Sequence, residues 1–162
     1  PTLKRNNLVK LLNENIKLLS EVNKSIEINF NKKDEEILLE CDKEQISRVF
    51  INLIKNSIES IEQKVEKNPD FKKKILIDIS SNNDHILISI EDNGVGFDKN
   101  NIEEILNPYY TTKKNGTGLG LSIVNKIIND HKGELKFIPI DNGAKIQIRF
   151  YFNDNRNINS WW

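Results

Sequence analysis

Two asparagines spaced four residues apart could bind a cation. Asn52 and Asn56 lie in a stretch with helical periodicity, so the two amides project side by side on one face of a helix. Amide oxygens are hard, neutral ligands, and Mg²⁺ usually keeps several waters while it takes few protein ligands besides substrate phosphates. Asn56 could fill such a position without adding charge repulsion. Taken alone, the pair could equally be two solvated side chains in an asparagine-rich chain.

A carboxylate followed by two glycines could bind a flat base. The stretch Asp92-Asn93-Gly94-Val95-Gly96 follows a predicted buried strand. A carboxylate accepts hydrogen bonds from an exocyclic amine such as that of adenine, and glycines allow the backbone to bend and approach a ligand closely. Because Asp, Asn and Gly are also the commonest turn residues, this motif alone does not distinguish a base-binding site from a surface turn.

A glycine-rich stretch before a helix could receive phosphate. Gly116-Thr117-Gly118-Leu119-Gly120-Leu121 opens a predicted helix, where unpaired backbone N–H groups and the positive helix end attract anions. Lys113 and Lys114 precede it and could neutralise phosphate charge. The stretch fits neither the dinucleotide-binding fingerprint nor a Walker loop, and a lone glycine-rich stretch is more often only a loop.

The combination of these motifs is more specific than any one of them. Four segments stand in the order and spacing of the N, G1, F and G2 boxes: Asn-Leu-Ile-Lys-Asn at 52–56, Asp-Asn-Gly-Val-Gly at 92–96, Asn-Pro-Tyr-Tyr-Thr-Thr-Lys at 107–113 and Gly-Thr-Gly-Leu-Gly-Leu at 116–121. Over about residues 8–152 the chain therefore resembles the histidine-kinase branch of the superfamily of gyrase, Hsp90 and MutL, which has the Bergerat ATP-binding fold. Its F and G2 boxes look most like those of the NtrY and NtrB nitrogen-regulation sensors.

The resemblance implies a role for each motif. Asn56 would ligate Mg²⁺, Asp92 would bind the adenine amine, and Gly94 and Gly96 would make room for the base. The resemblance implies catalytic roles for Asn52, Asn56 and Lys113. The residues expected to contact ATP are Lys55, Asn56, Asp92, Gly94, Gly96, Thr112, Lys113, Gly116, Thr117, Gly118, Leu119 and Gly120.

The residue at position 52 favours transfer to histidine over hydrolysis. ATP-hydrolysing relatives place a glutamate there as a general base, and an amide cannot take a proton. A neutral imidazole needs no base, so catalysis would rest on positioning and charge neutralisation. The two histidines, His85 and His131, are interpreted as a surface residue near a turn and part of a helix end. We therefore expect the acceptor histidine on a dimerisation domain outside this chain.

Two other functions stay open. A pseudokinase would bind ATP as a sensing or docking module without transfer, and a serine kinase or ATPase of the same fold would label a hydroxyl or release phosphate. As partners we expect the histidine-bearing domain of the same parent protein, which would form a homodimer, and a downstream response regulator of the NtrX or NtrC type.

Composition narrows the class of partner and the location. The 24 Lys and Arg balance 24 Asp and Glu, so no overall field favours nucleic acid or an anionic membrane. The apolar runs are far shorter than the roughly 20 residues that span a bilayer. The chain begins at Pro1 and has no methionine, which suggests excision from a longer protein. We expect a cytoplasmic piece, with a membrane-anchored parent as an open alternative.

The pattern of apolar residues predicts the elements that position these motifs. It indicates helices over about 4–22, from the N-cap Asp42 to Pro69, and over about 119–131 with Gly133 as C-terminal cap. It indicates strands at 26–30, 37–41, 75–79, 86–90, 135–138 and 145–152, the last two joined by an Asp141-Asn142-Gly143 turn.

Together these elements predict an α+β two-layer sandwich, with helices on one face of a mixed, mostly antiparallel sheet. The domain would span 1–152 with a nucleotide lid at about 97–120. The tail 153–162 would be a frayed end or, through Trp161-Trp162, a docking handle. Cys41 should be a small buried side chain on a strand.

Overall fold

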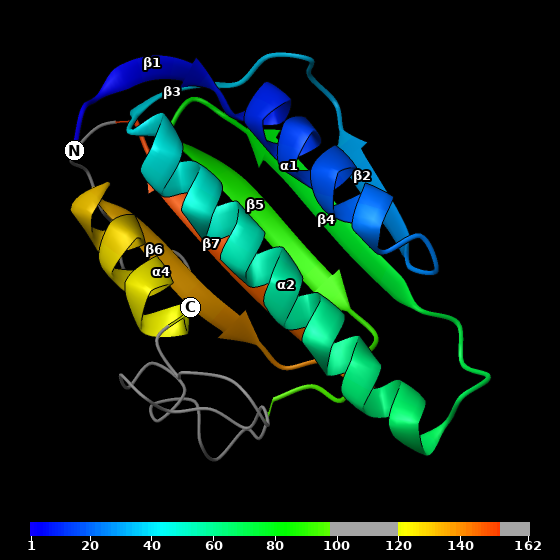
Figure 1. Cartoon of the computed structure of the whole chain (residues 1–162). Coiled ribbons are helices and arrows are strands. Elements are labelled where there is room, and N and C mark those ends of the chain that lie inside the picture. The colour runs from blue at the N-terminus through cyan, green and yellow to red at the C-terminus, as the bar shows by residue number, and fades with distance from the viewer. Residues whose placement is uncertain (98–119, 153–162) are drawn as a thin grey trace.

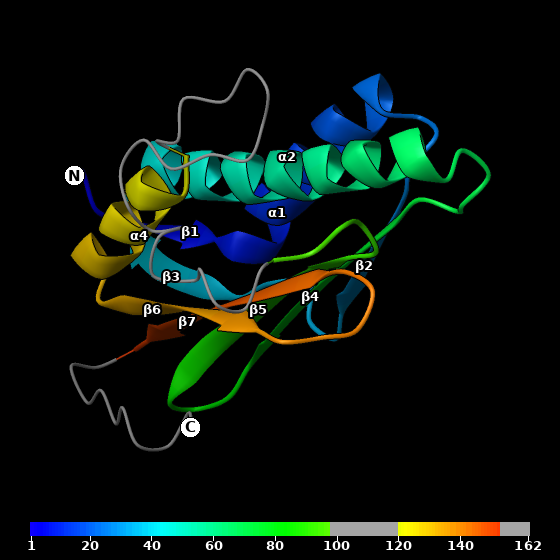
Figure 2. The same ribbon diagram turned by 90° about the horizontal axis from the view of Figure 1, so that it is seen from below.

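Helices cover one face of a five-stranded sheet. The structure is a computed structural model that describes residues 1–97 and 120–152. The sheet has the strand order β2-β4-β5-β7-β6, and Figure 2 shows α1, α2 and α4 on the same side of it. Only β2 and β4 pair in parallel, while the other neighbours are antiparallel. The predicted α+β sandwich with a mixed sheet is confirmed.

The strands follow the predicted alternation with small shifts at their ends. Alternate residues of the central strands, such as Ile86, Ile88 and Ile90, are buried under the helices, while their neighbours face the other side of the sheet. The bounds of the sheet strands are β2 Glu27–Lys32, β4 Lys74–Ser81, β5 His85–Asp92, β6 Gly133–Ile138 and β7 Ala144–Tyr151.

The N-terminal helix begins later than the sequence suggested. Residues Lys4–Asn7 form strand β1, which pairs antiparallel with β3 (Leu38–Cys41) as a separate two-stranded sheet (Figure 1). Helix α1 then runs over Leu8–Val22. The expected start at residue 4 was wrong because residues 4–7 pair with β3, and the helix begins only after Asn7, whose side chain accepts from the Val9 N–H at 3.1 Å.

The long helix α2, Lys43–Lys67, lies across the middle of the sheet (Figure 1). Asp42 is its N-cap, as predicted, and its carboxylate accepts from the backbone N–H groups of Glu44 and Gln45. The helix ends at Lys67, two residues before Pro69. Its buried face is apolar except for Ser57.

The end of α4 differs from the sequence expectation. Helix α4 covers Gly120–Asp130 beside α2, and Lys132, with φ 58°, takes the left-handed conformation assigned to Gly133. Gly133 instead begins β6, so its assignment as the helix cap was wrong. A Cβ at Gly133 would lie 2.9 Å from the Arg149 carbonyl oxygen, so glycine is required there by close strand packing.

The core lies between the helices and the inner face of the sheet. Its largest fully buried side chains include Phe50 of α2 and Phe150 of β7. Cys41 is fully buried on β3, as predicted, and burial raises the pKa of its thiol. Among the described residues, none of the helices has the length and apolar character needed to cross a membrane.

Candidate functional site

Asp92 is a buried carboxylate at the end of β5. Only 5% of its surface is exposed. The irregular segment that contains Gly94 and Gly96 follows β5 directly. The Gly94 N–H donates to Asp92 Oδ1 at 2.8 Å. Burial raises the pKa of Asp92 from 3.8 to about 6, and hydrogen bonds from Gly94, Ser57, Ser60 and Ala144 oppose this rise. The carboxylate is therefore ionised at neutral pH and can only accept.

Two serines of α2 face this carboxylate. Ser57 and Ser60 both lower the pKa of Asp92, and Ser57 is 6% exposed. Ser60 also receives the Gly96 N–H on its hydroxyl at 3.4 Å and the Val95 N–H on its carbonyl at 3.2 Å. Sequence reasoning missed both serines, although polar residues spaced by three on the apolar face of a helix are a usable signal.

The two glycines after Asp92 allow close packing between α2 and the loop. A Cβ at Gly94 would overlap the Ser60 side chain and would lie 2.7 Å from the Ile61 nitrogen. Gly96 has φ 81°, a conformation that favours glycine, and a Cβ there would meet the carbonyl oxygen of Gly143. Gly94 and Gly96 thus allow close contact with α2 and with Gly143. Their expected role in making room for a base stays a prediction.

Asn93 anchors the same segment from the other side. Its side-chain Oδ1 accepts from the Lys74 N–H at 3.0 Å, and its Nδ2 donates to the Lys72 carbonyl at 2.6 Å. The Lys64 ammonium group of α2 donates to the Asn93 carbonyl at 2.9 Å. Asp92 thus lies between β5, α2 and a segment that is held by the hydrogen bonds of Asn93, so it has little freedom to reorient.

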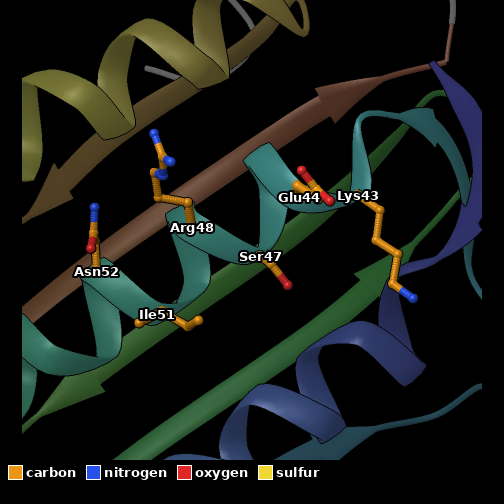
Figure 3. Close-up of a pocket in the computed structure, with 6 residues that line it drawn as sticks. All are labelled: Lys43, Glu44, Ser47, Arg48, Ile51 and Asn52. Carbon is orange, nitrogen blue, oxygen red and sulfur yellow. The ribbon is translucent and has the colours of Figure 1, made fainter. Parts of the chain in front are cut away.

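Asn52 and Asn56 occupy one face of α2, as the spacing predicted. Both are partly exposed, while Lys55 is exposed. Asn52 and Arg48 project toward the side of α2 on which α4 lies (Figure 3). They help to line a pocket of about 470 Å³ along the first turns of α2, whose lining residues are Lys43, Glu44, Ser47, Arg48, Ile51 and Asn52. Asp92 does not line this pocket, which lies toward the N-terminal end of α2.

Part of the expected phosphate site lies outside the described residues. The structure places Gly120 as the first residue of α4, and no described atom lies within 4 Å of the position that a Cβ would take there. Phe97 follows the Asp92 segment and packs edge-on against Phe137 of β6, with ring centroids 4.9 Å apart. The expected residues Thr112, Lys113, Gly116, Thr117, Gly118 and Leu119 fall among the residues that are not described.

His131 lies at a helix end and His85 beside a turn, as interpreted, but the His85 side chain is more buried than that of a surface residue. His85 is half-buried at the start of β5, beside Asp84 and the Tyr151 ring. His131 follows α4, where its Nδ1 faces the Ile127 carbonyl at 2.8 Å and its Nε2 accepts from the Asp42 N–H at 3.1 Å. His131 is thus a helix-end residue that also connects α4 to the start of α2.

The types of residue around Asp92 indicate which ligands would suit them. In the described ranges 1–97 and 120–152, no group of three or more His, Cys, Asp or Glu side chains is arranged to hold a metal ion. A buried acceptor at Asp92, close-packed glycines and an amide pair on the adjacent helix suit a base with an exocyclic amine and a cation that keeps neutral ligands.

Comparison with known proteins identifies the family. Residues 41–154 match the model of the histidine kinase-, DNA gyrase B- and HSP90-like ATPases. The chain belongs to this ATPase family. Among solved structures, the catalytic domain of the histidine kinase ThkA aligns with a TM-score of 0.80 and 30% identity over 92% of this chain and 95% of that one. The chain is therefore a catalytic domain of the histidine-kinase type.

Curated relatives of this catalytic domain come from several groups of sensor kinases. Sporulation kinase E of Bacillus subtilis is 39% identical over 59% of this chain and 12% of its own length. A putative NtrY-like sensor histidine kinase of Rickettsia conorii is 34% identical over 93% of this chain and 24% of its own. The chain thus spans at most about a quarter of these two relatives, and NtrY-like proteins are one of several groups that it resembles.

Proposed function

We propose that this domain binds ATP and transfers its γ-phosphoryl group to a histidine on a separate domain of the same parent protein. The observation that carries the proposal is the buried Asp92 carboxylate, 5% exposed, with glycines on one side and α2 on the other. Being ionised at neutral pH, it accepts from the adenine amine and disfavours bases that present an acceptor at that position.

The amide pair on α2 would hold the metal end of the nucleotide. Asn56 would ligate Mg²⁺ and Asn52 would orient the acceptor or a metal-bound water, because neutral amide oxygens can replace waters around a cation that also binds phosphates. Bound ATP and Mg²⁺ would supply an activated phosphoryl group whose charge the metal partly neutralises. The lack of a carboxylate at position 52 favours an imidazole acceptor over water.

The remaining phosphate contacts would come from a lid at about 97–120. We assign Thr112, Lys113, Gly116, Thr117, Gly118 and Leu119 to it, with Gly120 at the start of α4 and Lys55 on the exposed side of α2. Lysine ammonium groups and backbone N–H groups at a helix start both suit phosphate oxygens. The catalytic domain would span 1–152, followed by a tail at 153–162.

The proposed partners are two. One is a histidine-bearing dimerisation domain, which would make the parent a homodimer. The other is a response regulator of the NtrX or NtrC type, a choice supported by the NtrY-like relatives. A structure of ThkA in complex with the response regulator TrrA aligns with this chain at a TM-score of 0.76 and 26% identity. A cytoplasmic location would suit both partners.

The deciding experiment mixes this chain with γ-labelled ATP, Mg²⁺ and the histidine-bearing hairpin of its parent. We expect acid-labile, base-stable label on the hairpin. Asn56→Ala should lower labelling at least a hundredfold while Asn13→Ala, an exposed asparagine on α1, should match the wild type. Acid-stable label would indicate a serine kinase, free phosphate an ATPase, and nucleotide binding without transfer a pseudokinase.

A further inference from the structure

The side chain of Asn93 replaces its own backbone carbonyl in the pairing of β4 with β5. In this antiparallel pair Ile75 lies opposite Asp92, so the next opposed residues are Lys74 and Asn93. The Asn93 N–H donates to the Lys74 carbonyl at 3.3 Å, as in an ordinary antiparallel ladder. The Lys74 N–H, however, donates to Asn93 Oδ1 at 3.0 Å and not to the Asn93 carbonyl. The backbone carbonyl of Asn93 is therefore released from the sheet.

A lysine of α2 binds this released carbonyl. Lys64 Nζ donates to the Asn93 carbonyl oxygen at 2.9 Å, and the same ammonium group lies 5.1 Å from the centre of the Phe71 ring. Phe71 in turn packs against the hydrophobic core. Further along the chain, the Val95 N–H donates to the Ser60 carbonyl at 3.2 Å. Lys64 thus joins α2 to the part of the segment that lies nearest to β5.

The other end of the Asn93 amide holds the loop that precedes β4. Asn93 Nδ2 donates to the Lys72 carbonyl at 2.6 Å. An asparagine side chain offers both an acceptor oxygen and donor hydrogens, and here each kind is used on a backbone group. Aspartate would keep the acceptor and lose the donor, while alanine would lose both. Position 93 therefore requires an amide, a stricter demand than that for a polar turn residue.

These contacts determine where the base-binding segment lies relative to the amide pair of α2. Asp92 directly precedes Asn93, whereas Asn56 lies on α2, eight residues before Lys64 and thus roughly 12 Å away along the helix axis. In the proposed function one nucleotide must reach both Asp92 and Asn56. The contact between Lys64 and Asn93 links the two elements that carry these residues, so it sets the spacing that the nucleotide must match.

We propose that Asn93 and Lys64 are positioning residues that hold the base-binding segment at a fixed place on α2, and thereby set the affinity for ATP without taking part in phosphoryl transfer. The proposal rests on the function proposed above and deepens it. Neither residue is assigned a contact with the nucleotide, because both act through the backbone next to Asp92.

The test measures transfer from γ-labelled ATP to the histidine-bearing hairpin of the parent over a wide range of ATP concentrations, and ATP affinity by calorimetry. The variants are Asn93→Ala, Lys64→Met and Lys64→Arg. Methionine removes the donor but retains an apolar stem and a high helix propensity, whereas arginine retains a donor. Lys64→Met leaves every bond of the Asn93 side chain in place, so it keeps the proposal testable where Asn93→Ala proves unstable.

Two matched controls separate positioning from general support of the fold. Asn82 makes comparable bonds at the opposite end of the same hairpin, where its Oδ1 accepts from the N–H groups of Asp84 and His85 at 2.8 and 2.9 Å. Asn82→Ala should therefore lower the melting temperature but leave ATP affinity unchanged. Lys67 is an exposed lysine on the same helix as Lys64, and Lys67→Met should match the wild type in both respects.

We expect Asn93→Ala and Lys64→Met each to raise Kd and KM for ATP roughly tenfold, the size expected when one hydrogen bond to a charged group is lost. The kcat should stay near the wild-type value, because a contact that holds the base equally in the ground state and the transition state affects binding alone. Lys64→Arg should recover most of the affinity, since its guanidinium group can donate to the Asn93 carbonyl.

Wild-type Kd and KM in Asn93→Ala and Lys64→Met would overturn the proposal and leave the proposed function intact. A lower kcat with unchanged KM, shared with Asn82→Ala, would show that these contacts only support the fold, which also overturns it. Calorimetry does not need the hairpin, so it decides the proposal even where the wild type binds ATP without transferring it. No ATP binding by the wild-type chain would reject the proposed function together with this inference.

Discussion

Ionisation of the buried Asp92 is unfavourable for folding, although the proposed binding of a base requires the ionised carboxylate. Burial raises its pKa from 3.8 to about 6, which means that ionisation of this carboxylate costs stability in the free domain. Between these two values the folded state binds more protons than the unfolded state, so the stability of the domain falls as the pH rises through this window. A bound amine donor would recover part of that cost.

Asp92→Asn should therefore remove the stability cost of ionising a buried carboxylate and also the proposed contact with the base. Relative to the wild type, the variant should gain about 2–3 kcal/mol in unfolding free energy on going from pH 4 to pH 7.5, since each pKa unit corresponds to about 1.36 kcal/mol. Urea denaturation at both pH values measures this gain, and calorimetry should show severely weakened ATP binding. Asp70→Asn, at an exposed site, is the control and should show neither effect.

A gain that does not depend on pH would contradict the linkage assigned to Asp92. Unchanged ATP affinity in Asp92→Asn would remove its role with the base. The two measurements are independent, because the first uses only the free domain and the second needs the nucleotide.

Among the secondary-structure elements, the end of α4 is connected to the beginning of α2 through hydrogen bonds of the His131 side chain. Its ring uses both nitrogens, one toward the Ile127 carbonyl at 2.8 Å and one as acceptor for the Asp42 N–H at 3.1 Å. The second bond requires an unprotonated Nε2. Asp42 in turn caps α2, the helix that carries Asn52, Asn56 and the two serines.

We expect His131→Ala to lower the unfolding free energy by about 1–3 kcal/mol, because the Asp42 N–H loses its partner in a partly buried place. Chemical denaturation at pH 7.5 measures the loss. The matched control is His85→Ala, the other histidine, whose ring contacts Tyr151 and an exposed Asp84 at the edge of the molecule. An unfolding free energy of His131→Ala equal to that of the wild type would show that the contact between α4 and α2 contributes nothing measurable.

At the scale of the whole molecule, the candidate site depends on a turn far away in sequence. Gly143, in the turn between β6 and β7, packs directly on the Asp92 segment, and a Cβ there would overlap the Asp92 carbonyl oxygen and lie 3.1 Å from the Asn93 Cα. The register of β5 and β7 places Ala144 opposite Asp92. The pairing of β5 with β7 therefore determines which residues pack against the Asp92 segment.

Gly143→Ala should displace this segment and weaken ATP binding by roughly tenfold or more, as expected when a misplaced group loses a well-aligned hydrogen bond. Calorimetry measures the affinity, and a melting curve shows whether the domain remains folded. Asp141→Ala, in the same turn but exposed, should bind ATP like the wild type. Wild-type affinity in Gly143→Ala would mean that the turn and the site are not coupled.

Local patterns were sufficient for most of the fold. Alternating isoleucines in β4 and β5, and the apolar stripe of α2 behind its Asp42 cap, predicted these elements because period and capping are properties of a few neighbouring residues. The start of α1 and the role of Gly133 could not be predicted in this way. Both depend on partners distant in sequence, namely β3 for residues 4–7 and Arg149 of β7 for Gly133.

The family and the types of residue at the site could be predicted from the motifs, because Asn52, Asn56, Asp92, Gly94 and Gly96 stand in a recognisable order along the chain. How Asp92 is held became visible in the folded domain. Its partners Ser57, Ser60 and Ala144, and the packing of Gly143, come from segments 32 to 52 residues away along the chain. Burial and hydrogen bonding at one carboxylate depend on which elements meet in space, and no local spacing records that meeting.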